Sequence, residues 1–339
     1  MHRKRLVAGI AAALIASLTA ASAIAGAATV LTGAGSTLVA PLMAHWSPDF
    51  KNRTGITVFY GAVGSGTGIT DISQRVVKFG ASDAPLTSDQ AAACHSCVMI
   101  PWALTATAIG FHVNNIHSIR LSGPVLAKIY LGQITKWNAP QIKALNKRTN
   151  LPNLRITPVF RSDGSGDTYA FTDFMSRVSS AWAHRVGTAT AVSFPAGTGA
   201  KGNSGVAAVV KATNGTIGYM AASFLITQGI PASSLQNQAG NFEFPNLSNI
   251  ESAAQTVTNV PSSNALHIVN PPASASAAYP LSTFTYMIAP RTSSVAGQLS
   301  QFVRYAVGPG QRFGPALDFA KLPKVVVNAA LKAAKGLHG

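Results

Sequence analysis

The chain has 339 residues, of which 47% are hydrophobic and 11% are charged, and its formal net charge is +16. This composition excludes a disordered polar tail, and it provides enough apolar side chains for a large core. At roughly 150 residues per domain, the length predicts two lobes.

The N-terminus has the pattern of a secretory signal peptide. A basic start, MHRKR, is followed by the uncharged apolar run LVAGIAAALIASL and then by small residues that suit cleavage near Ala27. We therefore expect residues 1–27 to be a signal peptide and the protein to be periplasmic, extracellular or at the cell surface. An uncleaved anchor is the alternative, because the apolar run carries no charge.

The mature chain stays basic. Removing Arg3, Lys4 and Arg5 lowers the formal charge from +16 to +13. This excess could attract nucleic acid or an anionic surface, but Lys and Arg are scattered singly and not in runs. A basic exterior that attracts small anions fits equally well.

A strand, a Gly/Ser turn and an amphipathic helix follow one another three times, which is typical of α/β proteins. The strands and turns are predicted at 28–36, 56–68 and 155–167. The helical faces that follow them are predicted to contain Leu38, Leu42, His45 and Trp46; Ile69, Ile72 and Val76; and Phe171, Phe174, Met175, Val178 and Trp182.

Further elements are predicted between and after these units. Residues 106–113 and 283–289 look like buried strands, and residues 270–280 have the composition of a loop. A short helix capped by Ser88 is expected, and a basic C-terminal helix is expected to end at Gly336.

The only cysteines are Cys94 and Cys97. In an exported protein, this pair predicts a local disulfide. A redox motif and a zinc site are the alternatives, but no second cysteine pair completes a zinc site, and the βαβ context of a redox motif is not evident.

The three Gly/Ser turns suggest an anion site. A helix N-terminus has free N–H groups and a partial positive charge, Gly lets the backbone approach a ligand closely, and Ser or Thr adds a hydroxyl donor. One such turn is usually an ordinary connection, but here there are three, and one includes Arg161. None fits a P-loop or a dinucleotide fingerprint.

Three of the eight Asp residues, Asp83, Asp163 and Asp167, fall within these Gly/Ser-rich motifs or in the similar stretch 79–90. If Asp83 faces an anion, it repels a ligand such as sulfate that has no proton to donate, and it accepts a hydrogen bond from a protonated ligand. Arg161 supplies a planar donor fork for oxyanion oxygens. Asp163 is expected to orient Arg161.

These motifs resemble those of the periplasmic phosphate-binding proteins of the Pst-type ABC importer over nearly all of the mature chain. The matching phosphate loops are LTGAGSTLVAP, GAVGSGTG, FGASDAPLT and RSDGSGD, and other similar stretches are IYLGQITKWNAPQI, GNSGVAAVV, GTIGYM, YPLSTFTYMI and LDFAKLP. The resemblance implies an α/β class II periplasmic-binding-protein fold. Lobe I would comprise 28–107 plus 284–339 and lobe II 108–283, with crossover strands between them.

The resemblance also implies roles for individual residues. Hydroxyl or backbone donors would come from Ser36, Thr37, Leu38, Ser65, Ser165 and Gly166. Asp83 would accept the phosphate proton, and Arg161 would be the charged clamp. Leu38 replaces the usual Phe, which matters little for a main-chain donor.

Asp167 stands where many members have Thr, so it removes a side-chain donor. We expect Asp167 to turn away and cap the helix at 168–185, because Asp is a preferred N-cap. The alternative hypothesis is that Asp167 accepts a second proton, so that the site prefers dihydrogen phosphate. Affinity would then increase as the pH falls below neutral.

The sequence therefore predicts a monomeric phosphate receptor that delivers its ligand to the membrane permease of an ABC transporter, with no enzymatic activity, cofactor, metal or nucleic-acid partner. An exported phosphatase is one rival, but the histidines show no ligand spacing. A module that binds acidic polymers is the other, because of the +13 charge.

Overall fold

The computed structural model describes residues 30–339, so the predicted signal peptide at 1–27 lies outside the described residues. The strands are β1 (Val30–Gly35), β2 (Thr57–Ala62), β3 (Phe79–Ser82), β4 (Cys97–His112), β5 (Arg120–Leu121), β6 (Thr157–Arg161), β7 (Thr198–Ala200), β8 (Thr216–Ala221), β9 (Ser234–Gln236), β10 (Phe242–Glu243) and β11 (Ser282–Pro290).

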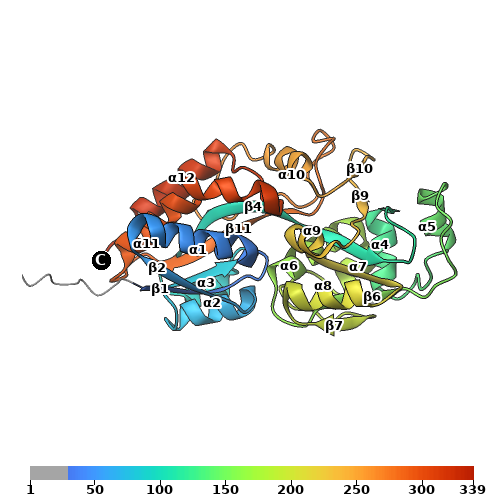
Figure 1. The fold of residues 1–339 in the computed structure, drawn as a ribbon, viewed down its shortest axis with the longest axis horizontal. Helices are drawn as coiled ribbons and strands as arrows, with labels where there is room; N and C mark the ends of the chain where they lie inside the picture. Colours follow the sequence, from blue (N-terminus) through green and yellow to red (C-terminus); the bar gives the residue numbers. More distant parts are fainter. Residues whose placement is uncertain (1–29) are drawn as a thin grey trace, which may run out of the picture.

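The helices cover both faces of the sheets (Figure 1). They are α1 (Ala40–Thr54), α2 (Ser65–Ser73), α3 (Ser88–Ala93), α4 (Gly123–Tyr130), α5 (Pro140–Leu145), α6 (Gly166–Val178), α7 (Ser180–Arg185), α8 (Gly202–Ala212), α9 (Ala222–Gln228), α10 (Leu247–Ala254), α11 (Ala296–Ala306) and α12 (Lys324–Lys335), with short 3₁₀ turns η1 (Pro309–Phe313) and η2 (Pro315–Leu317).

The main sheet runs through both lobes in the order β2-β1-β3-β11-β4-β8-β6-β7. The long strand β4 belongs to both halves, because residues 97–106 pair with β11 and residues 107–112 pair with β8. Figure 1 shows β1 to β3 with α1, α2, α11 and α12 in one lobe, and β6 to β8 with α4 to α9 in the other. This arrangement is consistent with the expected two-lobed α/β fold.

Each lobe has its own cluster of buried aromatic residues. In lobe I, Trp46 packs edge-on against Trp102, with a ring-centroid distance of 5.4 Å. In lobe II, Phe171 stacks on Tyr219 at 4.3 Å, beside Trp182. The two aromatic clusters belong to one continuous hydrophobic core, which supports the cleft from both sides.

The three predicted strand, turn and helix units are present as β1-α1, β2-α2 and β6-α6. Three details of the helical faces were wrong. His45 is exposed and stacks on Phe313, and Val76 lies beyond the end of α2 and is 66% exposed. The helix expected at 168–185 is broken at Ser179, whose side chain caps α7.

The other predicted elements lie close to where the sequence placed them. Residues 106–113 lie in or directly after β4, residues 283–289 lie in β11, and α12 ends before Gly336. The cap of α3 is Thr87 and not the Ser88 that the sequence suggested, because Thr87 and Gln90 form a reciprocal capping box. A disulfide joins Cys94 to Cys97.

The segment before β11 contacts both lobes. Helix α10 packs on β4 and β11, and Asn264 donates a hydrogen bond to the carbonyl of Met99. His267, in contrast, lies 3.4 Å from Asp173 on α6. The lobe boundaries at 107 and 284 therefore stay a prediction. Across residues 30–339, no helix is both long enough and apolar enough to cross a membrane.

Candidate functional site

The predicted ligand-binding residues lie at strand ends and helix starts that face one another. Strands β1, β2 and β3 are parallel, so their carboxyl ends meet at one edge of the lobe I sheet, and β6 ends at the facing edge of lobe II. Such edges are the usual ligand sites of open α/β sheets. The residues gathered there are Ser36, Thr37, Ser65, Asp83, Arg161, Asp163, Ser165, Gly166 and Asp167.

The lobe I half of the site is organised around Asp83. Ser36 Oγ donates a hydrogen bond of 2.6 Å to Asp83 Oδ2, and Ser65 Oγ lies 3.4 Å from the same oxygen. The N–H of Asp83 donates to Ser65 Oγ in return. The three residues follow different strands, and their hydrogen bonds join the three turns.

Asp83 is buried, and only one of its two carboxyl oxygens has a partner. Its Oδ1 atom makes no hydrogen bond with any residue that the structure describes. Burial, together with the nearby charge of Asp167, raises the pKa of Asp83 to about 7. A buried carboxylate oxygen with no donor is costly, so this oxygen is suited to a ligand that brings its own proton.

The lobe II half of the site contains its own cation. Arg161 is buried at the end of β6 and forms a two-pronged ion pair with Asp163, whose Oδ1 lies 2.8 Å from Arg161 Nε. Gly202 N–H also donates to Asp163. Although partial burial opposes ionisation, the Arg161 guanidinium holds the pKa of Asp163 below its usual range. Asp163 therefore fixes the plane of the guanidinium, as the sequence suggested.

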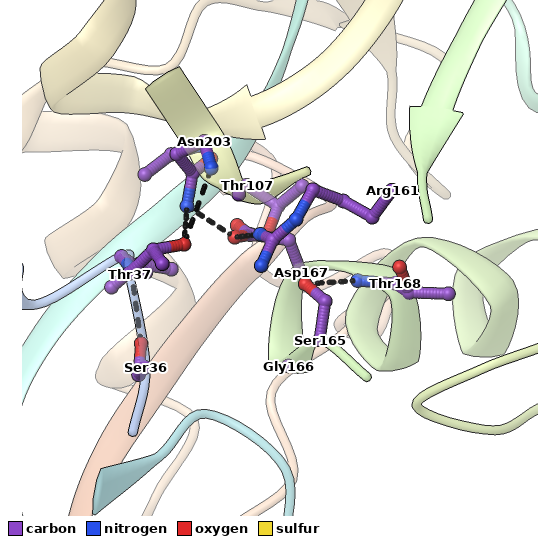
Figure 2. Close-up of polar contacts among 12 residues, drawn as sticks. Ser36, Thr37, Thr107, Arg161, Ser165, Gly166, Asp167, Thr168 and Asn203 are labelled. Carbon is purple, nitrogen blue, oxygen red and sulfur yellow. Dashed lines mark hydrogen bonds and ion pairs between the residues drawn. The ribbon is translucent and has the colours of Figure 1, made fainter. Parts of the chain in front are cut away.

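The expectation that Asp167 caps its helix was wrong. The N-cap of α6 is Ser165, whose Oγ accepts the N–H of Thr168. Asp167 is completely buried and points toward Arg161, whose Nη1 donates to it at 3.0 Å (Figure 2). Ser165 has the extended backbone conformation of an N-cap and directly precedes α6. Asp167 is therefore the second residue of the helix and not its cap.

Asp167 has a complete set of donors. Thr107 Oγ1 donates to its Oδ1 at 2.8 Å, and Asn203 Nδ2 donates to its Oδ2 at 2.7 Å, alongside Arg161. Burial nevertheless raises the pKa of Asp167, against the opposing effect of Arg161. Three side chains thus hold the carboxyl of Asp167 in one orientation: Arg161, Asn203 and, from strand β4, Thr107.

The two lobes touch one another directly across the site. Ser65 Oγ accepts the N–H of Gly166 at 3.1 Å, and Thr37 Oγ1 accepts a hydrogen bond from Asn203 Nδ2 at 2.9 Å. Gly166 is needed for this approach, because a Cβ atom there would lie 2.4 Å from the Cβ of Asp83. The structure therefore has the lobes closed on each other.

Sequence reasoning missed two members of this network, Thr107 and Asn203. Asn203 is the second residue of α8. Its side-chain oxygen Oδ1 accepts the N–H of Ala221, and its side-chain Nδ2 donates to Thr37 and Asp167. Asn203 lies in GNSGVAAVV, one of the stretches that resemble the family. That resemblance was the signal that could have pointed to Asn203. The N–H of Leu38, expected to face the ligand, donates to Ser36 Oγ at 3.0 Å.

The described residues contain no group of three or more His, Cys, Asp and Glu side chains that could hold a metal ion. His267 pairs with Asp173 and Arg177 on the surface of α6, away from the buried carboxylates. The arrangement that the site does provide is one guanidinium, several hydroxyl and amide donors, and two carboxyls with raised pKa values. These are the parts of a binding site for a protonated oxyanion.

Comparison with known proteins agrees with this description. The PBP superfamily domain matches residues 21–309, so the chain belongs to the class of periplasmic-binding-protein-like proteins. The phosphate-binding protein PstS of Xylella fastidiosa (strain Temecula1) is 34% identical over 304 residues, which cover 88% of this chain and 82% of that protein. PstS of Pasteurella multocida is 32% identical and covers 93% of both chains. The chain is a member of the PstS family.

The solved structures support the fold. The phosphate-binding protein of Stenotrophomonas maltophilia superposes with a TM-score of 0.71 at 20% identity, covering 90% of this chain and 94% of that one. The two-lobed class II architecture expected from the sequence is therefore confirmed.

Proposed function

We propose that this protein is an extracytoplasmic receptor that binds inorganic phosphate in the cleft and delivers it to the permease of an ABC importer. Its PstS relatives are named as phosphate-binding proteins, which supports the ligand class. The protein performs no chemical reaction on the ligand. The permease partner, the exported location and the monomeric state are part of this proposal.

The observation that carries the proposal is the buried Oδ1 of Asp83, which has no hydrogen-bond partner among the described residues. An oxyanion with a proton donates to this oxygen, and its remaining oxygens accept from the surrounding groups. Sulfate has no proton at neutral pH, so it leaves the buried oxygen unpaired and adds charge repulsion. A charge-assisted hydrogen bond contributes about 1.5–3 kcal/mol, which corresponds to roughly 10- to 100-fold discrimination.

The donors are assigned to both lobes. Thr37 and Ser65 would donate from the helix starts of lobe I, and Ser165 and Gly166 would donate from the start of α6 in lobe II. Ser65 and Gly166 are hydrogen-bonded to each other in this structure, so a ligand that binds there replaces that contact. Ser36 and Leu38 contribute through the first turn, and Arg161 is the charged clamp, oriented by Asp163. As an N-cap, the Ser165 hydroxyl accepts from Thr168 and keeps its own hydrogen for the ligand.

Closure follows from this division of donors. Neither lobe alone surrounds an oxyanion, so ligand binding stabilises the state in which the lobes meet. The direct contacts between Ser65 and Gly166 and between Thr37 and Asn203 add to the stability of that state. Opening of the cleft is then the step that releases phosphate to the permease.

The deciding experiment is isothermal titration of the purified protein with phosphate and with sulfate. We expect phosphate to bind with one-to-one stoichiometry and sulfate to bind at least tenfold more weakly. Equal binding of the two anions would refute the role of Asp83. Hydrolysis of a phosphate ester by the same preparation would instead support a phosphatase.

A further inference from the structure

One long part of the chain is basic and has no carboxylate to balance it. Residues 90–160 contain seven Lys and Arg residues and no Asp or Glu. These residues form β4, β5, α4, α5 and β6, so most of their charge lies in lobe II. Within residues 30–339, none of the seven cations forms an ion pair.

Part of this charge lines a groove at the end of lobe II. A hollow of about 650 Å³ is lined by Arg120, Lys147 and Arg148, and a second of about 610 Å³ is lined by His117 and Arg148. The two hollows share the lining residues Ser118, Arg148 and Thr149, so they adjoin each other, and we refer to the pair as the groove. Figure 1 places α5, next to this groove, at the outer end of lobe II, away from the contact between the lobes.

The groove has a fixed framework. The buried side chain of Asn146 accepts the N–H of Arg120 at 2.8 Å and donates to its carbonyl at 2.9 Å, so that the end of α5 is joined to β5. The guanidinium of Arg120 lies over the ring of Phe242 at 5.4 Å from its centroid. The cations of the groove are therefore presented from an ordered surface and not from a free tail.

The chemistry of the lining selects the class of ligand. Both hollows contain cations together with hydroxyl and amide donors, and neither is lined by a carboxylate from the described residues. Such a surface binds a chain of negative charges. The one aromatic ring, Phe242, is already stacked under Arg120, so the groove lacks the bare aromatic platform on which nucleic-acid bases stack.

We propose that this groove is a second site, which binds linear polyphosphate, a chain of condensed phosphate groups without bases. Successive phosphates would contact Arg120 and Lys147 in the first hollow, Arg148 where the hollows join, and His117 in the second. A single flexible chain can enter a concave surface, whereas a flat membrane cannot follow it. This proposal goes beyond orthophosphate binding in the cleft and does not depend on it.

The test compares two matched triple variants in the presence of saturating orthophosphate. The groove variant is Arg120→Gln, Lys147→Gln, Arg148→Gln. The control, Lys324→Gln, Lys332→Gln, Lys335→Gln, removes three exposed lysines from α12 in lobe I and so makes the same change in net charge. Fluorescence anisotropy with labelled linear polyphosphate gives the affinity at two salt concentrations.

We expect the groove variant to bind polyphosphate roughly tenfold or more weakly and with a smaller salt dependence, while the control stays within about twofold of the parent protein. Calorimetric titration of orthophosphate should be unchanged in both variants, which shows that the fold and the cleft are intact. If the triple variant does not fold, Lys147→Gln with Arg148→Gln is compared with the double control Lys332→Gln with Lys335→Gln, which makes the same change in net charge.

Three results would overturn the proposal. Absence of polyphosphate binding by the parent protein is the first, and equal weakening in the two triple variants is the second, because it would indicate diffuse net charge. The third is stronger binding of oligothymidylate or of phosphatidylglycerol vesicles than of polyphosphate at the same salt concentration. A failure of orthophosphate binding alone would refute the proposed function of the cleft and leave the groove unaffected.

Discussion

The two halves of the cleft treat their buried carboxylates in opposite ways. In lobe II, Asp163 and Asp167 surround Arg161, and every carboxyl oxygen accepts at least one hydrogen bond. In lobe I, Asp83 has two serine hydroxyls and no ion pair, and one of its oxygens has no partner among the described residues. The lobe II half is complete within the protein, whereas the lobe I half is completed by a ligand proton.

This difference separates affinity from selectivity. Arg161 supplies N–H donors that suit any small oxyanion, and Asp163 and Asp167 keep it aligned and offset its positive charge. Asp83 attracts only an anion that can donate a proton to it, and it penalises anions that have none. Changes in lobe II should therefore affect binding of all anions, and changes at Asp83 should alter which anion is preferred.

The largest effect is expected from Arg161→Met. The substitution removes the clamp and leaves Asp163 and Asp167 buried without their cation, so phosphate affinity should fall by more than about a thousandfold and the free energy of unfolding by ~3–5 kcal/mol. Calorimetry and urea unfolding measure the two quantities. The matched control is Arg177→Met, which breaks the exposed ion pair with Asp173 and should cost less than about 1 kcal/mol. Equal effects of the two variants would contradict the proposed role of the lobe II half.

The sequence predicted the positions of some residues in the two halves of the cleft and not of others. Asp83, Arg161 and Asp163 were predicted to lie at one site, because Gly/Ser turns after strands indicate where a sheet edge binds anions, and the structure places all three at the facing strand ends. Their roles in binding stay a prediction. Asp167 was misplaced, because local cap preference favoured it while Ser165 took the cap and tertiary partners took the carboxyl. Thr107 lies 60 positions from Asp167 in the sequence, and Asn203 lies 36 positions from it. A local sequence pattern does not reveal contacts over such separations.

The lobe I half is tested most directly by Asp83→Asn. The amide can donate a hydrogen bond, so sulfate should gain and the preference for phosphate over sulfate should fall by about 10- to 100-fold. Competition titrations with the two anions measure this ratio. A variant that keeps the full preference would contradict the assignment of selectivity to Asp83.

The same variant gives a prediction for stability. Burial raises the pKa of Asp83 to about 7, so the native state binds this proton more tightly than the unfolded chain. Stability is therefore lost as the pH rises from the ordinary Asp range through about 7. Without ligand, Asp83→Asn should raise the free energy of unfolding by about 1–3 kcal/mol above that pH and have little effect in acid. Urea unfolding at several pH values measures the difference.

A smaller effect on binding is expected from Gly166→Ala, which tests the contact between the halves. The new Cβ would lie 2.4 Å from the Cβ of Asp83, so the lobes cannot approach as closely. Phosphate affinity should fall at least about tenfold, and lobe II should remain folded because alanine is favourable in a helix. The control Gly297→Ala adds a Cβ in α11 that has no neighbour within 4 Å. Small-angle scattering with phosphate should show a more open shape for Gly166→Ala alone.

The smallest effect is expected from Asp167→Thr, which asks whether the lobe II half also uses a proton. Burial raises the pKa of Asp167 as well. If the bound phosphate shares one proton with Asp83 and a second with Asp167, the complex holds two protons, whereas free hydrogen phosphate brings only one. Binding then takes up one proton from solution. Phosphate affinity should then rise by up to about tenfold per pH unit as the pH falls toward neutral. The rise should end near pH 7, and not continue below neutral as the sequence hypothesis stated, because Asp83 in the free site already holds a proton there.

Asp167→Thr removes the second acceptor, so calorimetry across this pH range should show a flat profile for the variant and a sloped one for the parent protein. The conservative change Asp167→Asn retains the size of the side chain and should also give a flat profile, which separates proton uptake from a loss of packing around Thr107 and Asn203. If the parent protein itself shows no slope, Asp167 acts only as a counter-ion that orients Arg161. The contrast between the two halves of the cleft would then be complete, with all proton recognition at Asp83.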